Sequence, residues 1–385
     1  MTHDGLTSGR AIVIGASGQD GYFLTERLIN QNWRVHAVTR RPEALAEPAQ
    51  SPNAGGRLEI HVVDLTFPLP LFDLIGQVQP EEIYNLAGQS SVSHSFTEPG
   101  IAWRTNADFV AELLECVRLK SAHSRVYQAS STDMFGGSTD QTVFYDENSA
   151  LNPRSPYASA KAAAHRLCQF YRETYGLRIA SGILANHESH RRPRSFLTRK
   201  VVEHVMTLQD LSAQVADLSP LTLGNLKVRR DWGFAPDYVQ GMCAILRQID
   251  IRGTKEALED IGRNYRDYVL STGETHAVWE LVDSAFRIGG FDIEWDLEGD
   301  DPALWRGYFS ATRAPAVIVN PQLLRVSEPL IIQVDPSRAR AELGWAPRHG
   351  LEVFLNDMFA NLPRPVAANR AVEIKSQEIL DGVLA

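Results

Sequence analysis

The chain has 385 residues, of which 44% are hydrophobic and 22% are charged, and this balance is typical of a soluble globular protein with one large or two moderate domains. Its formal net charge of -9 at pH 7 argues against a general nucleic-acid binder, because phosphate binding requires a basic surface. No apolar run reaches the roughly 18 residues of a membrane span, and no signal peptide is visible. We therefore expect a cytoplasmic protein.

The three cysteines, Cys116, Cys168 and Cys243, lie far apart in apolar, helix-like surroundings. Their spacing does not match that of metal ligands, so we expect packing residues in a reducing compartment. We expect no metal site.

The first element is a predicted strand at residues 11–14, which a glycine loop and a helix follow. The loop carries Gly15, Gly18 and Gly21, and apolar residues at helical spacing come after it. Glycines allow a tight turn and a close approach of the backbone, and the free N–H groups at a helix N-terminus favour an anion. This pattern predicts a site for the pyrophosphate of a dinucleotide.

The second predicted strand, at residues 35–39, ends at Arg40 and Arg41. An NAD enzyme usually has an acid here for the ribose hydroxyls, whereas arginine suits the 2′-phosphate of NADP. NADP is therefore favoured over NAD, the alternative being that both arginines are merely solvated. Residues 42–57 contain three prolines with several glycines and alanines, which predicts a surface loop.

Further strands are predicted at residues 58–65, 82–87 and 177–184, and helices at residues 106–118 and 157–175. Strands that alternate with helices predict an α/β fold with a doubly wound parallel sheet of the Rossmann type. Polar residues cluster where several of these strands end, at the edge where open parallel sheets bind their ligands.

Residues 126–136 predict a buried strand that breaks into a loop with Ser131 and Asp133. If Ser155-Pro156 opens a helix, Tyr157 and Lys161 lie four residues apart on one face. A free phenol has a pKa near ~10, and a nearby ammonium lowers it, so this tyrosine could take a proton from a sugar hydroxyl. Such a pair alone is more often an ordinary helix face, and it gains weight here from its surroundings.

Two basic clusters, at residues 190–200 and 223–232, stand out in a chain that is acidic overall. A solvated basic face is the simpler interpretation, but these clusters could hold a diphosphate. We expect an NADP-binding domain at residues 1–188 with 231–275 and a smaller, mixed α/β sugar-nucleotide domain at 189–230 with 276–362. Residues 363–385 are expected to form a C-terminal tail.

With these residues in hand, the chain resembles the extended short-chain dehydrogenase/reductase superfamily and, within it, the GDP-mannose 4,6-dehydratase family, from about residue 11 to residue 363. The motifs specific to that family are Gly18-Gln-Asp-Gly21, Arg40-Arg41, Arg154-Ser-Pro-Tyr157, Asn186-His-Glu-Ser189, Thr198-Arg-Lys200, Leu223-Gly-Asn225, Arg230-Asp-Trp-Gly233 and Thr272-Gly-Glu274. Many motifs in one order do not recur by chance.

The resemblance implies roles for named positions. The implied catalytic residues are Ser131, Asp133, Tyr157 and Lys161. The implied cofactor residues are Gly15, Gly18, Gln19, Asp20, Gly21, Arg40, Asp64, Leu65, Leu86, Ala87, Tyr157, Lys161, His187 and Arg192. The implied substrate residues are Ser90, Asn186, Lys200, Asn225, Arg230, Arg325 and Glu328.

Two features depart from the family pattern. The family's Thr-Ser-Glu is Ser131-Thr132-Asp133 here, which keeps the type of chemistry but shortens the acid/base arm. The loop after Arg41 is shorter and lacks the serine-rich segment that reaches a neighbouring subunit's cofactor, so a homodimer is favoured over the family's tetramer.

The resemblance implies conversion of GDP-mannose to GDP-4-keto-6-deoxymannose: oxidation at C4, loss of water across C5 and C6, and return of the hydride to C6. A sugar-nucleotide epimerase, reductase or decarboxylase on the same scaffold is the nearest alternative, and a non-catalytic NADP-binding protein is another. An acid at position 133 favours elimination, since an epimerase needs none there.

Overall fold

A computed structural model describes residues 9–210, 219–253, 261–325 and 328–364. The chain forms two compact units. The first consists of Met1–Arg191, Val228–His276 and Val326–Leu351, and the second of Arg192–Lys227, Ala277–Arg325 and Glu352–Ala385. Both units are therefore built from separate stretches of the sequence. Residues 326–351, which the sequence analysis places in the sugar-nucleotide domain, group with the first unit, and most of the expected C-terminal tail lies outside the described residues.

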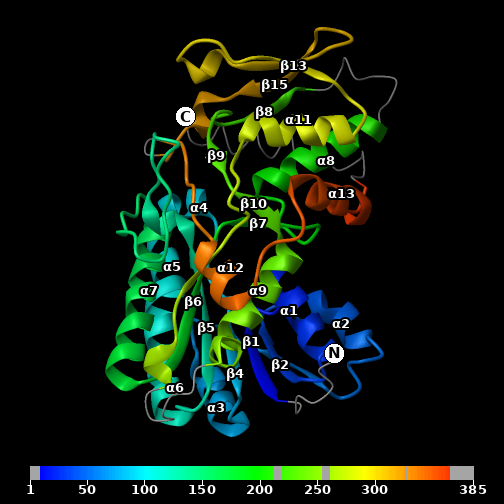
Figure 1. Ribbon diagram of the computed structural model, residues 1–385. Helices are drawn as coiled ribbons and strands as arrows, with labels where there is room; N and C mark the ends of the chain where they lie inside the picture. Colours follow the sequence, from blue (N-terminus) through cyan, green and yellow to red (C-terminus); the bar gives the residue numbers. More distant parts are fainter. Residues whose placement is uncertain (1–8, 211–218, 254–260, 326–327, 365–385) are drawn as a thin grey trace. The chain divides into compact units, whose positions relative to one another are not determined.

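The first unit is built on a seven-stranded parallel sheet with the strand order β11-β6-β5-β4-β1-β2-β3 (Figure 1). Its strands are β1 (Arg10–Ile14), β2 (Arg34–Thr39), β3 (Leu58–Val62), β4 (Glu82–Asn85), β5 (Arg125–Ser131), β6 (Arg178–Leu184) and β11 (Tyr268–Leu270). The order reverses between β1 and β4, which is where a doubly wound sheet binds its ligand. The predicted fold class is confirmed.

Helices of this unit pack on the sheet and connect its strands. They are α1 (Gln19–Asn30), α2 (Ala46–Gln50), α3 (Leu69–Val78), α4 (Val92–Thr97), α5 (Pro99–Trp103), α6 (Phe109–Lys120), α7 (Pro156–Tyr175), α9 (Ala235–Leu246), α10 (Gln248–Arg252) and α12 (Ser337–Leu343). Three short strands, β7 (Asn186–Glu188), β9 (Arg229–Arg230) and β10 (Trp232–Phe234), lie outside the main sheet, and β7 pairs with β10.

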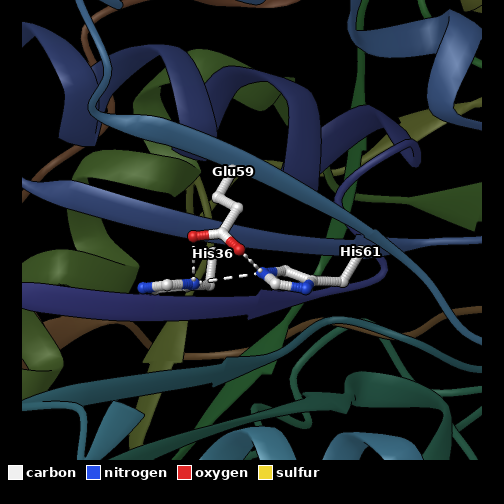
Figure 2. Close-up of side chains that lie close together, drawn as sticks. All are labelled: His36, Glu59 and His61. Atoms are coloured by element: carbon white, nitrogen blue, oxygen red, sulfur yellow. Dashed lines mark hydrogen bonds and ion pairs between the residues drawn. The ribbon is translucent and has the colours of Figure 1, made fainter.

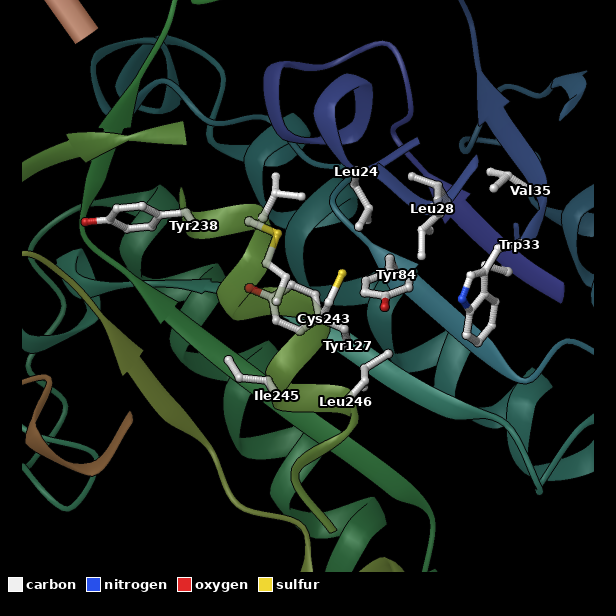
Figure 3. Close-up of a cluster of buried hydrophobic side chains, with 14 of the residues drawn as sticks. Leu24, Leu28, Trp33, Val35, Tyr84, Tyr127, Tyr238, Cys243, Ile245 and Leu246 are labelled. Atoms are coloured by element: carbon white, nitrogen blue, oxygen red, sulfur yellow. The ribbon is translucent and has the colours of Figure 1, made fainter. Parts of the chain in front are cut away.

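A separate hydrophobic core lies on each face of the sheet, because central parallel strands bury side chains on both sides. On one face, Leu24 and Leu28 of α1 and Tyr238 and Leu246 of α9 pack in one cluster with alternate residues of the strands (Figure 3). The strand residues include Tyr84 of β4 and Tyr127 of β5. On the other face, α3, α6 and α7 contribute Leu71, Ile75, Leu113, Val117 and Cys168. All three cysteines are buried and free, as predicted for packing residues.

The second unit contains a four-stranded mixed sheet with the order β13-β14-β15-β8. Its strands are β8 (Leu221–Leu223), β13 (Ile293–Asp296), β14 (Arg306–Phe309) and β15 (Pro315–Val319), and its helices are α8 (Leu197–Asp210), α11 (Val278–Ile288) and α13 (Leu351–Asn361). The two-residue strand β12 (His276–Ala277) lies where the chain passes from the first unit to the second. Within the described residues, none of the helices is both long and apolar enough to cross a membrane.

The predicted surface loop at residues 42–57 is wrong for its first half. Pro42–Leu45 forms a 3₁₀ turn and α2 follows it directly. Pro42 stands at a first-turn position, where proline is compatible with a helix, and Leu45 is fully buried in the core beside α1. Proline count therefore overstated the irregularity of this segment.

Candidate active site

The glycine loop lies at the sheet's reversal point, between β1 and α1. Gly15 has a φ of +85°, and a Cβ there would lie 2.9 Å from the backbone nitrogen of Ala87, at the end of β4. A Cβ at Gly21 would lie 2.3 Å from the carbonyl oxygen of Gly15. The backbone amide of Leu86 donates to the carbonyl of Ile14 at 3.0 Å, which holds the two strand ends side by side. Only glycine fits these positions, and the arrangement suits the pyrophosphate of a dinucleotide at the N-terminus of α1.

Gln19 and Asp20, in the first turn of α1, bind the strand β7. The Nε2 of Gln19 donates to the carbonyl of His187 at 2.9 Å, and Ser189 Oγ donates to Gln19 Oε1 at 2.8 Å. His187 Nε2 lies 2.9 Å from Asp20 Oδ2, and its Nδ1 lies 2.8 Å from the carbonyl of Ala185. Both ring nitrogens of His187 therefore lie within hydrogen-bonding distance of oxygen atoms, one on α1 and one on its own segment. Three predicted cofactor residues are thus joined in one network, a link that their separate motifs did not reveal.

Tyr157 and Lys161 lie in the first two turns of α7, and both are buried. The predicted helix start is confirmed: the Oγ of Ser155 accepts a hydrogen bond from the Ala158 amide at 3.1 Å. Lys161 Nζ donates to the Ala129 carbonyl on β5 at 3.0 Å and lies 5.9 Å from the centroid of the Tyr157 ring. Burial lowers the pKa of Lys161 from 10.5 to about 8.

Ser131 and Asp133 lie at the carboxyl end of the same strand, β5. Ser131 Oγ accepts a hydrogen bond from the Asp133 amide at 3.2 Å and donates to its carboxylate at 3.3 Å. Asp133 is half-buried in a short 3₁₀ turn that follows the strand, Thr132–Phe135. Ala129, whose carbonyl binds Lys161, lies two residues before Ser131 on β5. The end of β5 therefore positions Lys161 as well as Ser131 and Asp133.

The ends of β2, β3 and β4 carry the remaining cofactor candidates of this unit. Arg40 and Asp64 are exposed after β2 and β3. The Asp64 carboxylate accepts a hydrogen bond from the Thr66 amide at 3.0 Å, which, with a smaller contribution from the charge of Arg40, lowers the pKa of Asp64. Leu65 packs partly against the core, and Ser90 is exposed in the loop after β4.

The predicted substrate residues are divided between the two units. Ser90, Asn186, Arg230 and Glu328 belong to the first, whereas Lys200, Asn225 and Arg325, with the cofactor candidate Arg192, belong to the second. Their convergence on one nucleotide remains a prediction.

Local contacts hold several of these side chains in place. Arg230 Nη1 donates to the Pro329 carbonyl at 3.0 Å, and its Nη2 lies 4.0 Å from Glu328 Oε1. Lys200 Nζ donates to the Thr222 carbonyl at 2.8 Å. Asn225 Oδ1 accepts a hydrogen bond from the amide of Lys227 at 3.0 Å.

Asp231 has a role that sequence reasoning missed. Its buried carboxylate accepts hydrogen bonds from the Thr272 amide and hydroxyl, at 3.1 and 2.8 Å, and from the Gly273 amide at 2.8 Å. Burial raises the pKa of Asp231 to about 6. Asp231 thereby holds the strand end beside Arg230. The signal was present, since both segments belong to family motifs, but their contact is not visible in the sequence.

The sequence was compared with family models and with known proteins. The family model described as GDP-mannose 4,6 dehydratase matches residues 12–358. The chain belongs to this family. A GDP-mannose 4,6-dehydratase of Sinorhizobium fredii is 36% identical over 366 residues, which cover 92% of this chain and 95% of that protein. The corresponding protein of Drosophila melanogaster is 34% identical over 364 residues, covering 90% of this chain and 84% of the relative.

Solved structures with lower identity share the fold. DesIV, a dTDP-glucose 4,6-dehydratase from Streptomyces venezuelae with NAD and TYD bound, has a TM-score of 0.70 at 21% identity and covers 91% of this chain and 97% of its own. RMD from Pseudomonas aeruginosa, complexed with NADPH, has a TM-score of 0.64 at 20% identity, covering 92% and 98%. The family of sugar-nucleotide enzymes and its fold are as predicted from the sequence.

Proposed function

We propose that this chain is an NADP-dependent GDP-mannose 4,6-dehydratase that forms GDP-4-keto-6-deoxymannose. The observation that carries the proposal is the arrangement at the end of β5, where Lys161 binds the Ala129 carbonyl and Ser131 binds Asp133. A tyrosine–lysine pair serves many reactions of this fold. The carboxylate of Asp133, which follows the same strand that Lys161 binds, would supply the additional base that an elimination requires.

In this reaction, a bound nicotinamide supplies the acceptor for the hydride of C4 and returns that hydride to C6. Tyr157 removes the proton of the 4-hydroxyl, and Ser131 holds the same oxygen. The resulting ketone acidifies the C5 hydrogen, which Asp133 abstracts. The same residue then protonates the departing 6-hydroxyl, so that water leaves. Return of the hydride to C6 leaves an enolate, which takes a proton from solvent at C5, and Tyr157 releases to solvent the proton that it removed. Net oxidation is zero because the hydride removed in the first step is restored in the last.

The preference for NADP rests on Arg40, which follows β2 and is exposed. A guanidinium can form paired charge-assisted bonds to a 2′-phosphate. Similar structures were solved with NAD in several cases and with NADPH in one, so a nicotinamide dinucleotide is common to them, and the 2′-phosphate is proposed on Arg40 alone. For the assembly, we propose a homodimer, on the short segment after Arg41.

Asp133→Asn tests the elimination. The variant should still oxidise C4, giving NADPH absorbance, but should not lose water. A misplacement of ~1 Å can already cost about a hundredfold in rate, and loss of the base should cost at least that. The exposed Asp140, whose carboxylate binds only the Thr142 amide and hydroxyl among the contacts described, provides the matched control Asp140→Asn, which should leave the rate unchanged.

The product distinguishes the alternatives. In deuterated water, the unaltered enzyme should place solvent deuterium at C5 of a 6-deoxy-4-keto sugar, as measured by mass spectrometry and NMR. Formation of this product by Asp133→Asn at the original rate would remove Asp133 from the mechanism. A product that keeps its 6-hydroxyl would instead indicate an epimerase or a reductase.

A further inference from the structure

The strands β2 and β3 bring together two histidines and a glutamate, away from the residues proposed to act in catalysis. His36 on β2 lies opposite Glu59 on β3 in the parallel register, and His61 follows two residues later on the same face. Figure 2 shows the two imidazole rings and the carboxylate pointing toward one another. Among the described residues, this is the one group of three histidine, cysteine or acidic side chains close enough to share an ion.

The separations between the donor atoms match those of a zinc site. His36 Nδ1 lies 3.1 Å from His61 Nε2 and 3.5 Å from Glu59 Oε2, and His61 Nε2 lies 3.6 Å from Glu59 Oε1. Two ligands at about 2.0–2.1 Å from a tetrahedral Zn²⁺ are about 3.3 Å apart. The three separations thus differ from this value by a few tenths of an ångström.

We propose that His36 Nδ1, His61 Nε2 and the Glu59 carboxylate bind one divalent transition-metal ion, of which Zn²⁺ is the best match. Two imidazoles and a carboxylate are a ligand set that zinc accepts, and a water would complete a tetrahedron. Glu59 is exposed, so an ion could reach the site from solvent, whereas His36 is buried in the sheet, which would hold its ring in place.

The electrostatic surroundings allow this ligand set. A metal binds the neutral form of an imidazole, and the carboxylate of Glu59 is the anionic ligand of the set. Arg10 and Arg34 are also near His36 and oppose a cation. Arg10 is paired with Glu81 at 3.1 Å, and the Glu59 carboxylate supplies a negative charge to the ion itself. Without an ion, a single proton shared between the two rings accounts for their 3.1 Å contact.

No metal site was expected from the sequence, because the spacing of the cysteines does not match that of metal ligands. The proposed ligands come instead from two strands whose register is set by the whole sheet. A bound ion would join β3, the edge strand, to its neighbour β2. None of the three ligands is a proposed catalytic residue, so we expect the ion to stabilise this edge of the sheet.

The test uses the untagged full chain, freed of metal with a chelator. Titration with Zn²⁺ in a calorimeter should show one ion per chain, and Co²⁺ should give the visible absorption of a tetrahedral nitrogen and oxygen site without a thiolate band. Glu59→Gln and His61→Ala should each weaken Zn²⁺ binding at least about tenfold. The exposed His123 provides the matched control, and His123→Ala should bind as tightly as the unaltered chain.

Thermal unfolding gives a second measurement, since an ion that binds only the folded chain raises its melting temperature. Zn²⁺ should raise the melting temperature of the unaltered chain and of His123→Ala, but not that of the other two variants. Glu59 is exposed, so Glu59→Gln should fold normally. Absence of saturable binding by the unaltered chain, or equal affinity in Glu59→Gln or in His61→Ala, would overturn the proposal.

Discussion

Replacing Lys161 with methionine should reveal the cost of burying its ammonium. Burial lowers the pKa of Lys161 from 10.5 to about 8, which at about 1.4 kcal/mol per pKa unit is a destabilisation of about 3 kcal/mol when the group is charged. The hydrogen bond from Nζ to the Ala129 carbonyl, at 3.0 Å, offsets about 1.5–3 kcal/mol of this cost. Methionine removes both contributions, so at neutral pH we expect Lys161→Met to be as stable as the unaltered chain or up to about 2 kcal/mol more stable, although inactive.

The pH dependence provides the sharper result. Because the folded chain has the lower pKa, the unfolded chain binds more protons between about pH 8 and pH 10.5, and stability rises with pH over that window. Between about pH 7.5 and about pH 9.5, the rise due to Lys161 is about 2 kcal/mol. Lys161→Met should lack this rise, whereas the contributions of all other groups cancel in the comparison.

The assay is urea unfolding of both chains at the two pH values. The matched control is Lys120→Met: Lys120 is exposed, its Nζ lies 2.9 Å from an Asp73 oxygen, and this hydrogen bond raises the pKa of Lys120. The control should not remove the rise. If the unaltered chain and Lys161→Met change in stability by equal amounts between the two pH values, Lys161 is not desolvated, and the argument for a buried ammonium that supports Tyr157 fails.

Two further predictions concern the ligands. Arg40→Ala should weaken NADP binding far more than NAD binding, because only NADP carries the 2′-phosphate, and equal weakening in a fluorescence titration would contradict the assignment. Arg230→Ala should raise the substrate Michaelis constant at least about tenfold, since a charge-assisted hydrogen bond contributes about 1.5–3 kcal/mol. Unchanged GDP affinity of Arg230→Ala in calorimetry would place the diphosphate elsewhere.

The parts of the site that could be predicted are those with local signals. The start of α7 was predictable because Ser155 is a good cap and Pro156 suits the first turn, and this fixed the spacing of Tyr157 and Lys161. The glycine loop was predictable for a similar reason: a strand, the turn and the helix N-terminus follow one another in the sequence.

The parts that could not be predicted depend on long-range pairing. The hydrogen bond from Lys161 to Ala129 and the contact of Asp231 with Thr272 join residues that are 32 and 41 positions apart. The grouping of residues 326–351 with the first unit was not predictable, for the same reason. Ser138 exchanges two backbone hydrogen bonds with Ile331, at 2.8 and 3.0 Å, and this pairing draws the late segment into the first unit. Nothing in either segment alone indicates the other.

The interleaved composition of the two units has a consequence for synthesis on the ribosome. Six strands of the large sheet are complete by Leu184, but β11, which covers the outer edge of β6, begins only at Tyr268. While the intervening residues are being made, β6 presents an unpaired edge to other nascent chains. A fragment that stops near residue 191 would keep that edge permanently, so truncation at this apparent domain boundary should yield an aggregating product and not a separable cofactor-binding module.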